Sequence, residues 1–249
     1  MNRRTIMPLM EHIIELRKLI IAILGVFAVS MAIGIAVSPL IIDYIKHTPP
    51  ASRMEWNVFS PFDGIRMYMT VACAFAFTVS LPAALFLLWS FVKKGLHLHE
   101  RQAALRYIPY SALCLLLGIA FGYYVVLPMS FSFVTSISEK MNLVETYGIA
   151  QYFSFMLNLI LPIAASFELP IVVMFLTRIG LLTPERLRKS RRYTYPVLVI
   201  VANLLSPPDF VSAFIILVPL AALFEISLFL SRLADRKRPE PETGAEAAA

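Results

Sequence analysis

Charged residues are scarce in this sequence. Asp, Glu, Lys and Arg make up 15% of its 249 residues, whereas hydrophobic residues make up 59%. A soluble domain averages about 25% charged residues, so the composition excludes that class and predicts an integral membrane protein. The net charge of +6 does not indicate a nucleic-acid-binding protein. The basic residues lie in loops between apolar runs, and phosphate binding requires a basic face.

Cysteine, metal-binding and catalytic motifs are also missing. Cys73 and Cys114 both fall inside apolar runs, where they are expected to be small buried side chains rather than a disulfide framework or a metal site. His97 and His99 lie in a polar loop and are interpreted as solvated. The sequence has no serine nucleophile with a base and no phosphate-binding loop. It therefore predicts neither an enzyme nor a cofactor. The energy for any process that the protein drives must come from another protein or from the proton gradient.

Long apolar runs are abundant. About 20 apolar residues cross the hydrocarbon core of a bilayer. Six runs of this kind, the fifth of them short, cover residues 19–37, 66–88, 107–128, 155–176, 193–205 and 210–230. We therefore predict an all-α polytopic membrane protein of six transmembrane helices, with loops at 38–65 and 131–154. A single membrane domain is expected over 1–236, followed by a disordered tail at 237–249 that has nothing to bury.

Proline and glycine predict the shape of the bundle. Prolines inside or beside the runs should bend or end helices and leave a concave, partly hydrated bundle. They are Pro82, Pro128, Pro162, Pro170, Pro196 and Pro219. Gly118 and Gly122, four residues apart, permit close packing of the third helix against a neighbour.

Lysine and arginine are distributed unevenly between the two ends of the predicted bundle. One end receives the basic residues of segments 3–4, 17–18, 93–106, 178–192 and 232–238. The other end receives Lys46, Arg53 and Lys140, with Arg66 at its edge. Cytoplasmic loops of membrane proteins carry the excess of Lys and Arg, so both termini are predicted to be cytoplasmic.

One carboxylate falls well inside an apolar run. Glu168 lies in the fourth run, and a charge at that depth costs several kcal/mol unless it is protonated, paired or hydrated. It marks either a functional cavity or a neutral side chain that holds two helices together. No basic residue of its own helix is near, so its partner must be water, another span or an inserted subunit. Glu225 and Asp209 are weaker candidates of the same kind, and Asp209 has the alternative role of a helix cap.

The segment before the first run is amphipathic. Glu11 and Glu15 lie four residues apart on one helical face, and apolar residues line another, so the segment is predicted to lie along the membrane surface. An acidic patch in a basic chain indicates a cationic partner. An ordinary juxtamembrane helix with solvated charges is the alternative.

Short motifs that follow one another along nearly the whole chain resemble the TatC family, the multispanning subunit of the twin-arginine protein translocase. They begin with His12-Ile-Ile-Glu-Leu-Arg17 and continue with Ser60-Pro-Phe62, Trp89-Ser-Phe91, His99-Glu-Arg101, Phe121-Gly-Tyr-Tyr-Val-Val-Leu-Pro128, Ser166-Phe-Glu-Leu-Pro170, Leu182-Thr-Pro-Glu-Arg-Leu-Arg188, Ser206-Pro-Pro-Asp209 and Leu223-Phe-Glu-Ile226. Each motif alone is weak, but together and in this order they are highly specific.

The resemblance implies a receptor for signal peptides that carry paired arginines. The residues that match the family's arginine-contacting acids are Glu15 and Glu100, and Arg17, Phe91 and Arg101 match positions around the same site. The chemistry is suitable, because guanidinium pairs with carboxylate through two parallel hydrogen bonds that lysine does not reproduce.

The resemblance also implies partners. Glu168 matches an intramembrane acid at which single-span proteins of the TatA and TatB type dock, and Asp209 is the second candidate. Transport of folded cargo would then use the proton motive force in contact with membrane lipid, and a second copy of the chain is a further candidate partner. Leu87 and Ala213 stand where the family often has glutamine, which leaves any polar contact at those two positions in doubt.

Two other functions compete with this interpretation. Glu168 and Asn158 at membrane depth are compatible with a proton-coupled small-molecule transporter. Transporters of this size often contain two similar halves, and no such repeat is visible here. A membrane-embedded enzyme has no catalytic residues to support it.

Overall fold

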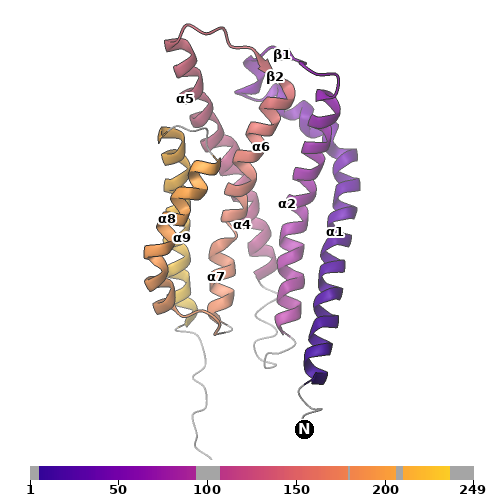
Figure 1. The fold of residues 1–249 in the computed structure, drawn as a ribbon, viewed down its shortest axis with the longest axis vertical. Helices are drawn as coiled ribbons and strands as arrows, with labels where there is room; N and C mark the ends of the chain where they lie inside the picture. Colours follow the sequence, from indigo (N-terminus) through magenta and orange to yellow (C-terminus); the bar gives the residue numbers. More distant parts are fainter. Residues whose placement is uncertain (1–5, 94–106, 179, 206–209, 236–249) are drawn as a thin grey trace, which may run out of the picture.

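A computed structural model describes residues 6–93, 107–178, 180–205 and 210–235 of the chain. These residues form long helices that run roughly side by side, with short connections at the two ends of the bundle (Figure 1). The helices α1 and α2 form one side of the molecule, α7, α8 and α9 form the other, and α4 and α6 lie between them (Figure 1).

The helices in chain order are α1 (Ile6–His47), α2 (Asp63–Lys93), α4 (Tyr107–Phe121), α5 (Leu127–Lys140), α6 (Ile149–Ser166), α7 (Leu169–Arg178), α8 (Pro184–Leu205) and α9 (Phe210–Asp235). A 3-10 turn, η1 (Ala51–Arg53), and a π-helical turn, η2 (Gly122–Val126), interrupt this series. Two two-residue strands, β1 (Trp56–Asn57) and β2 (Tyr147–Gly148), pair in parallel.

The helices make six passes along the bundle, because α4, η2 and α5 form one pass and α6 and α7 form another. Five passes are long and apolar enough to cross a membrane, and α8 makes the remaining one with a short apolar run after a basic start. The predicted six-helix membrane fold is therefore confirmed. The first turn of α1 and the last turn of α9 lie at the same end of the bundle (Figure 1), as an even number of passes requires.

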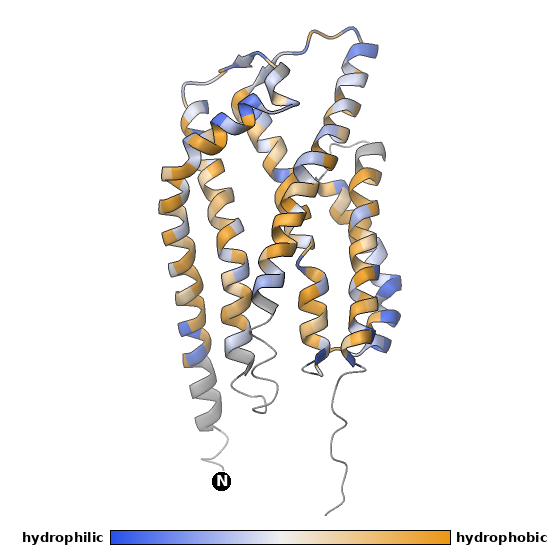
Figure 2. Ribbon diagram, turned by 180° about the vertical axis from the view of Figure 1, so that it is seen from behind, coloured by the Kyte–Doolittle hydropathy of each residue, from blue (hydrophilic) through white to orange (hydrophobic). Residues whose placement is uncertain are grey.

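Several boundaries differ from the sequence prediction. The predicted loops at 38–65 and 131–154 are partly helical, since α1 continues to His47, α5 continues to Lys140 and α6 already begins at Ile149. The N-terminal amphipathic segment is not a separate surface helix but forms the first turns of α1. Hydropathy detects the part of a helix that lies in lipid, and these helices extend beyond it, as the hydrophilic ends in Figure 2 show.

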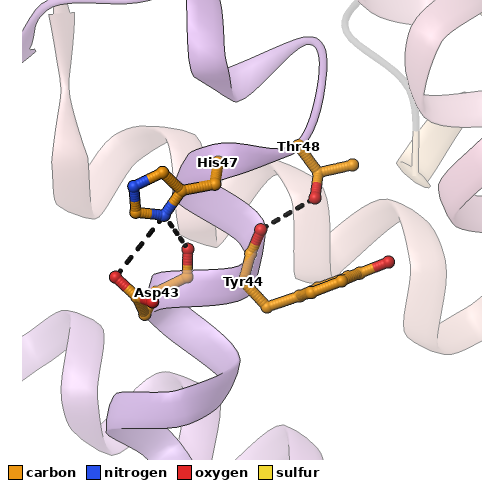
Figure 3. Close-up of polar contacts among 4 residues, drawn as sticks. All are labelled: Asp43, Tyr44, His47 and Thr48. Atoms are coloured by element: carbon orange, nitrogen blue, oxygen red, sulfur yellow. Dashed lines mark hydrogen bonds and ion pairs between the residues drawn. The ribbon is translucent and has the colours of Figure 1, made fainter.

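The C-terminal end of α1 is closed by its own side chains (Figure 3). Thr48 Oγ1 donates to the carbonyl of Tyr44 at 2.8 Å, and His47 Nδ1 donates to the carbonyl of Asp43 at 2.8 Å. The Thr48 bond satisfies the carbonyl of Tyr44, one of the last four of the helix, which have no partner within it. Pro49 follows directly, and the residue before a proline is disfavoured in the helical conformation, so the helix ends here.

Prolines explain the two irregular passes. A proline has no N–H to donate to the carbonyl four residues earlier, and its ring clashes with that carbonyl. For Pro128 this carbonyl belongs to Tyr124, inside the π-helical turn η2. For Pro170 it belongs to Ser166, the last residue of α6 before the break at Phe167. The prediction that prolines bend or end helices is confirmed at both places. The other prolines it named do not end a helix, because the helix continues past each of them: Pro82, Pro162, Pro196 and Pro219.

Glycine allows close approach at two helix crossings. A Cβ added at Gly34 of α1 would lie 2.7 Å from the carbonyl oxygen of Ala72 in α2. A Cβ added at Gly118 of α4 would lie 2.8 Å from the Cα of Ala164 in α6. Any larger residue would push these backbones apart, so the close packing predicted for Gly118 is confirmed.

The core of the molecule is centred on α6. Its side chains Phe153, Met156, Leu159 and Ile163 are almost completely buried, and they belong to one cluster with buried residues of η2 and α9. Lipid tails are as apolar as these side chains, so tight packing rather than escape from water holds the helices together. This core positions α7 and its N-terminal break against α4 and α9.

Candidate functional site

Glu168 lies at the break between α6 and α7. The helix resumes directly after it, since the carbonyl of Glu168 accepts from the backbone N–H of Ile171 at 3.1 Å and of Val172 at 3.0 Å. The break therefore places a carboxylate in the middle of a membrane pass. Only 3% of Glu168 is exposed.

Another span supplies a partner for Glu168. Ser111 Oγ of α4 donates to Glu168 Oε1 at 2.9 Å, and Ser111 is itself buried. The second carboxylate oxygen, Oε2, is buried and has no hydrogen-bond partner among the residues that the structure describes. The arrangement leaves one oxygen of Glu168 with unused hydrogen-bonding capacity, in surroundings where a lost hydrogen bond is costly.

Apolar and aromatic side chains surround this pair. Phe167, which precedes Glu168 in the chain, packs against Phe121 of α4, and the centroids of the two rings lie 5.7 Å apart. On the side toward α2, Trp89 stacks on Phe175 with ring centroids 4.7 Å apart, in a small buried cluster with Ile171. The elements that meet at Glu168 therefore bring mainly apolar and aromatic side chains to this part of the bundle.

Sequence analysis missed Ser111, although one signal pointed to it. Residues seven apart lie on the same face of a helix, so Ser111 shares a face with Gly118, the glycine predicted to pack closely. Gly118 contacts Ala164 and Phe167. Ser111 lies two turns before Gly118 on this face of α4. It is therefore placed to meet the part of the chain that follows Ala164 and Phe167, where Glu168 lies.

The second intramembrane acid, Glu225 of α9, has a different environment. Arg191 of α8 pairs with Glu225 Oε2 through Nη2 at 2.5 Å, and the Tyr195 hydroxyl donates to Oε1 at 2.8 Å. The side chains of Arg191 and Glu225 are 38% and 40% exposed. Sequence analysis ranked Glu225 below Glu168 and did not identify its partners.

The predicted signal-peptide site is described in part. Glu15 of α1 is half-buried and Arg17 is exposed, both near the end of the bundle where the chain starts. Phe91 belongs to the last turn of α2, which ends at that same end (Figure 1). Glu100 and Arg101 lie outside the described residues, as does Asp209 of the intramembrane prediction.

The two positions that depart from the family pattern occupy different places. Ala213 is buried in the first turns of α9, and Leu87 is half-buried in the last turns of α2. Neither side chain offers a hydrogen bond.

Two of the hollows between the described helices have apolar linings. One, of about 360 Å³, lies among α1, α2, α4 and α6, with Tyr44 and Tyr124 at its edge joined by a hydrogen bond of 3.0 Å between their hydroxyls. The other, of about 550 Å³, lies between η2, α5 and α9. No cluster of three potential metal ligands occurs within the described ranges.

The chain matches the model of a known protein family. The family model described as "Sec-independent protein translocase protein (TatC)" matches residues 11–219. A Sec-independent protein translocase protein TatC from Halalkalibacterium halodurans is 40% identical over 237 residues, covering 95% of this chain and 93% of that protein. The protein of the same name from Escherichia coli K12 is 34% identical over 232 residues, covering 90% and 88%.

A solved structure has the same fold. The crystal structure of a twin-arginine translocase receptor, TatC, superposes with a TM-score of 0.78 at 27% sequence identity, covering 90% of this chain and 99% of that chain. The likeness therefore extends over most of the chain rather than over a single motif.

Proposed function

We propose, from the premise that this chain belongs to the TatC family of Sec-independent protein translocases, that it is the receptor for twin-arginine signal peptides in such a translocase. In this role it passes folded proteins across the cytoplasmic membrane with TatA- and TatB-type single-span partners and the proton motive force. Its family is a family of translocase subunits rather than of enzymes.

Charge distribution supports the orientation that this role needs. The end of the bundle that holds the first turn of α1 and the last turn of α9 carries the basic start of α8, together with Arg17, Lys18 and Arg232. The opposite end has few basic residues, among them Lys46 and Lys140. Because cytoplasmic ends carry the excess of Lys and Arg, we infer that both termini are cytoplasmic.

The observation that carries the proposal is the position of Glu15. It is a half-buried carboxylate at the predicted cytoplasmic end of α1. α2 ends and α4 begins at that end (Figure 1), and the chain between them contains Glu100 and Arg101. Two carboxylates, Glu15 and Glu100, would suit two guanidinium groups, and Arg17, Phe91 and Arg101 complete the proposed peptide site.

Binding of a labelled twin-arginine peptide to the purified protein tests this assignment. Glu15→Gln and Glu100→Gln should each lose one partner of a charge-assisted hydrogen bond, which costs about 1.5–3 kcal/mol and so weakens binding about tenfold to a hundredfold. Glu139→Gln is the matched control, because Glu139 is an exposed acid at the opposite end of the bundle. Unchanged affinity in both test variants would refute the assignment.

Partner docking is the second element of the proposal. We propose that Oε2 of Glu168, which is buried and has no hydrogen-bond partner among the described residues, accepts a hydrogen bond from a donor on an inserted single-span helix, and Asp209 is the other polar candidate. Assembly of several copies of the chain around such partners is compatible with the two apolar hollows between the helices.

A further inference from the structure

The basic residues of α8 form two sets. Its first half contains Arg186, Arg188, Lys189, Arg191 and Arg192. Arg191 faces α9 and pairs with Glu225. Arg188, Lys189 and Arg192 are exposed, on the side of the helix away from the buried Leu187 and Leu198. Only the inward arginine has a carboxylate partner among the described residues.

The three outward cations lie close together. Positions three and four apart are neighbours on a helix surface, and like charges there destabilise the helix. Arg188 and Lys189 are both neighbours of Arg192 in this sense. The Arg192 guanidinium lies over the ring of Tyr193, 4.7 Å from its centroid. An anion that bridges these side chains would remove the repulsion.

An exposed apolar surface continues from this cluster along the same face. Pro196, Val199 and Ile200 are exposed, and Leu204 is 80% exposed. From Arg192 to Leu204 the helix rises about 18 Å at about 1.5 Å per residue. Half the hydrocarbon core of a bilayer is about 15 Å thick, so this apolar surface has the length of one lipid leaflet. Figure 2 shows the hydrophilic start of α8 at the edge of the hydrophobic band.

We propose that the outward face of α8 binds an anionic phospholipid. Its phosphate lies among Arg188, Lys189 and Arg192, and one acyl chain follows Pro196 and Ile200. The basic cluster and the apolar surface lie on the same face of α8. This combination favours a lipid over a soluble phosphate or an acidic protein segment, because a lipid carries both a negative headgroup and an apolar chain of this length. The proposal depends on the membrane fold and not on the proposed receptor function.

Electron paramagnetic resonance of spin-labelled lipids tests the proposal. The full-length protein is reconstituted into phosphatidylcholine vesicles that contain a trace of spin-labelled phosphatidylglycerol or spin-labelled phosphatidylcholine. The wild-type protein should immobilise the phosphatidylglycerol probe preferentially. Each basic residue near a charged membrane surface changes binding about fivefold, so K189Q/R192Q should reduce this preference about tenfold or more. Added salt should weaken the wild-type preference, since it screens exposed charges.

Two further variants make the result decisive. K189R/R192K keeps both charges and should keep the preference. R17Q/K18Q removes two exposed charges from α1 at the same end of the bundle and should reduce the preference by a clearly smaller factor than K189Q/R192Q, because Arg17 and Lys18 lie outside the cluster on α8. Equal losses in R17Q/K18Q and K189Q/R192Q, or no preference for phosphatidylglycerol in the wild type, would overturn the proposal. If K189Q/R192Q is poorly folded, Lys189→Gln alone gives the same comparison with Lys18→Gln.

Discussion

The two carboxylates within the helical bundle, Glu168 and Glu225, are held in opposite ways. Glu168 is 3% exposed, and within the described residues its only hydrogen-bond donor from a side chain is the neutral hydroxyl of Ser111. Glu225 is 40% exposed and receives both an arginine and a tyrosine hydroxyl. The buried acid is thus the one with fewer partners, the reverse of what stability alone would favour.

The difference shows which of the two residues has a structural role. Glu225 uses both oxygens to join α8 to α9, as expected of a residue that stabilises a helical hairpin. Glu168 keeps one oxygen unused, and an acid that is expensive to bury and incompletely satisfied is a candidate for function. The following predictions test this contrast.

The largest effect is expected for Glu168→Ala. It should abolish partner cross-linking and transport while leaving binding of a twin-arginine peptide unchanged, and Glu168→Gln should be milder because the amide oxygen still accepts a hydrogen bond. Protein level, peptide cross-linking and partner cross-linking are measured on the same variant. Loss of folded protein, with peptide binding falling in proportion, would instead assign Glu168 a purely structural role.

Gly118→Ala should come next. Its Cβ would lie 2.8 Å from the Cα of Ala164 and separate α4 from α6, which also separates Ser111 from Glu168. Overpacking of this kind costs about 1–3 kcal/mol, measured as a lower midpoint of thermal unfolding in detergent. Gly25→Ala is the matched control, because an added Cβ at Gly25 of α1 meets nothing within 4 Å. Equal stability of the two variants would contradict the close crossing.

Ser111→Ala should destabilise the protein by about 1–2 kcal/mol, because it leaves both oxygens of a buried carboxyl without a described side-chain donor. In a double-mutant cycle with Glu168→Ala, the two effects should fail to add by at least about 0.5 kcal/mol. The same unfolding measurement gives all four corners of the cycle. Strict additivity would mean that the hydrogen bond makes no contribution to stability.

The smallest effect is expected for Arg191→Gln. Exposed ion pairs contribute about 0–1 kcal/mol, and Glu225 would retain the Tyr195 hydroxyl. Unfolding of Arg191→Gln is compared with that of Arg188→Gln, which lacks a described carboxylate partner on the same helix. If Arg191→Gln lowered the free energy of unfolding more than Ser111→Ala does, the partners of Glu225 would matter more for stability than the partner of Glu168, which would contradict the contrast.

The sequence by itself determined the membrane class, the six passes and two of the places where a proline interrupts a helix. These properties depend on composition and on residues a few positions apart. Pro128 and Pro170 act on the carbonyls of Tyr124 and Ser166, four residues earlier, whatever the rest of the molecule does. Helix ends beyond the lipid, such as 131–140 of α5, were not predicted, because their polarity resembles that of a loop.

Only the tertiary structure decided how the two acids are satisfied. Ser111 lies 57 positions from Glu168, and Arg191 lies 34 positions from Glu225. Hydropathy shows that each helix spans the membrane but not which neighbour it meets or how it is rotated, because every lipid-facing surface is equally apolar. Neighbour and rotation are set by packing details such as the contact of Gly118 with Ala164. The packing of neighbouring helices thus gives Glu225 two partners and leaves one oxygen of Glu168 without a hydrogen bond among the described residues.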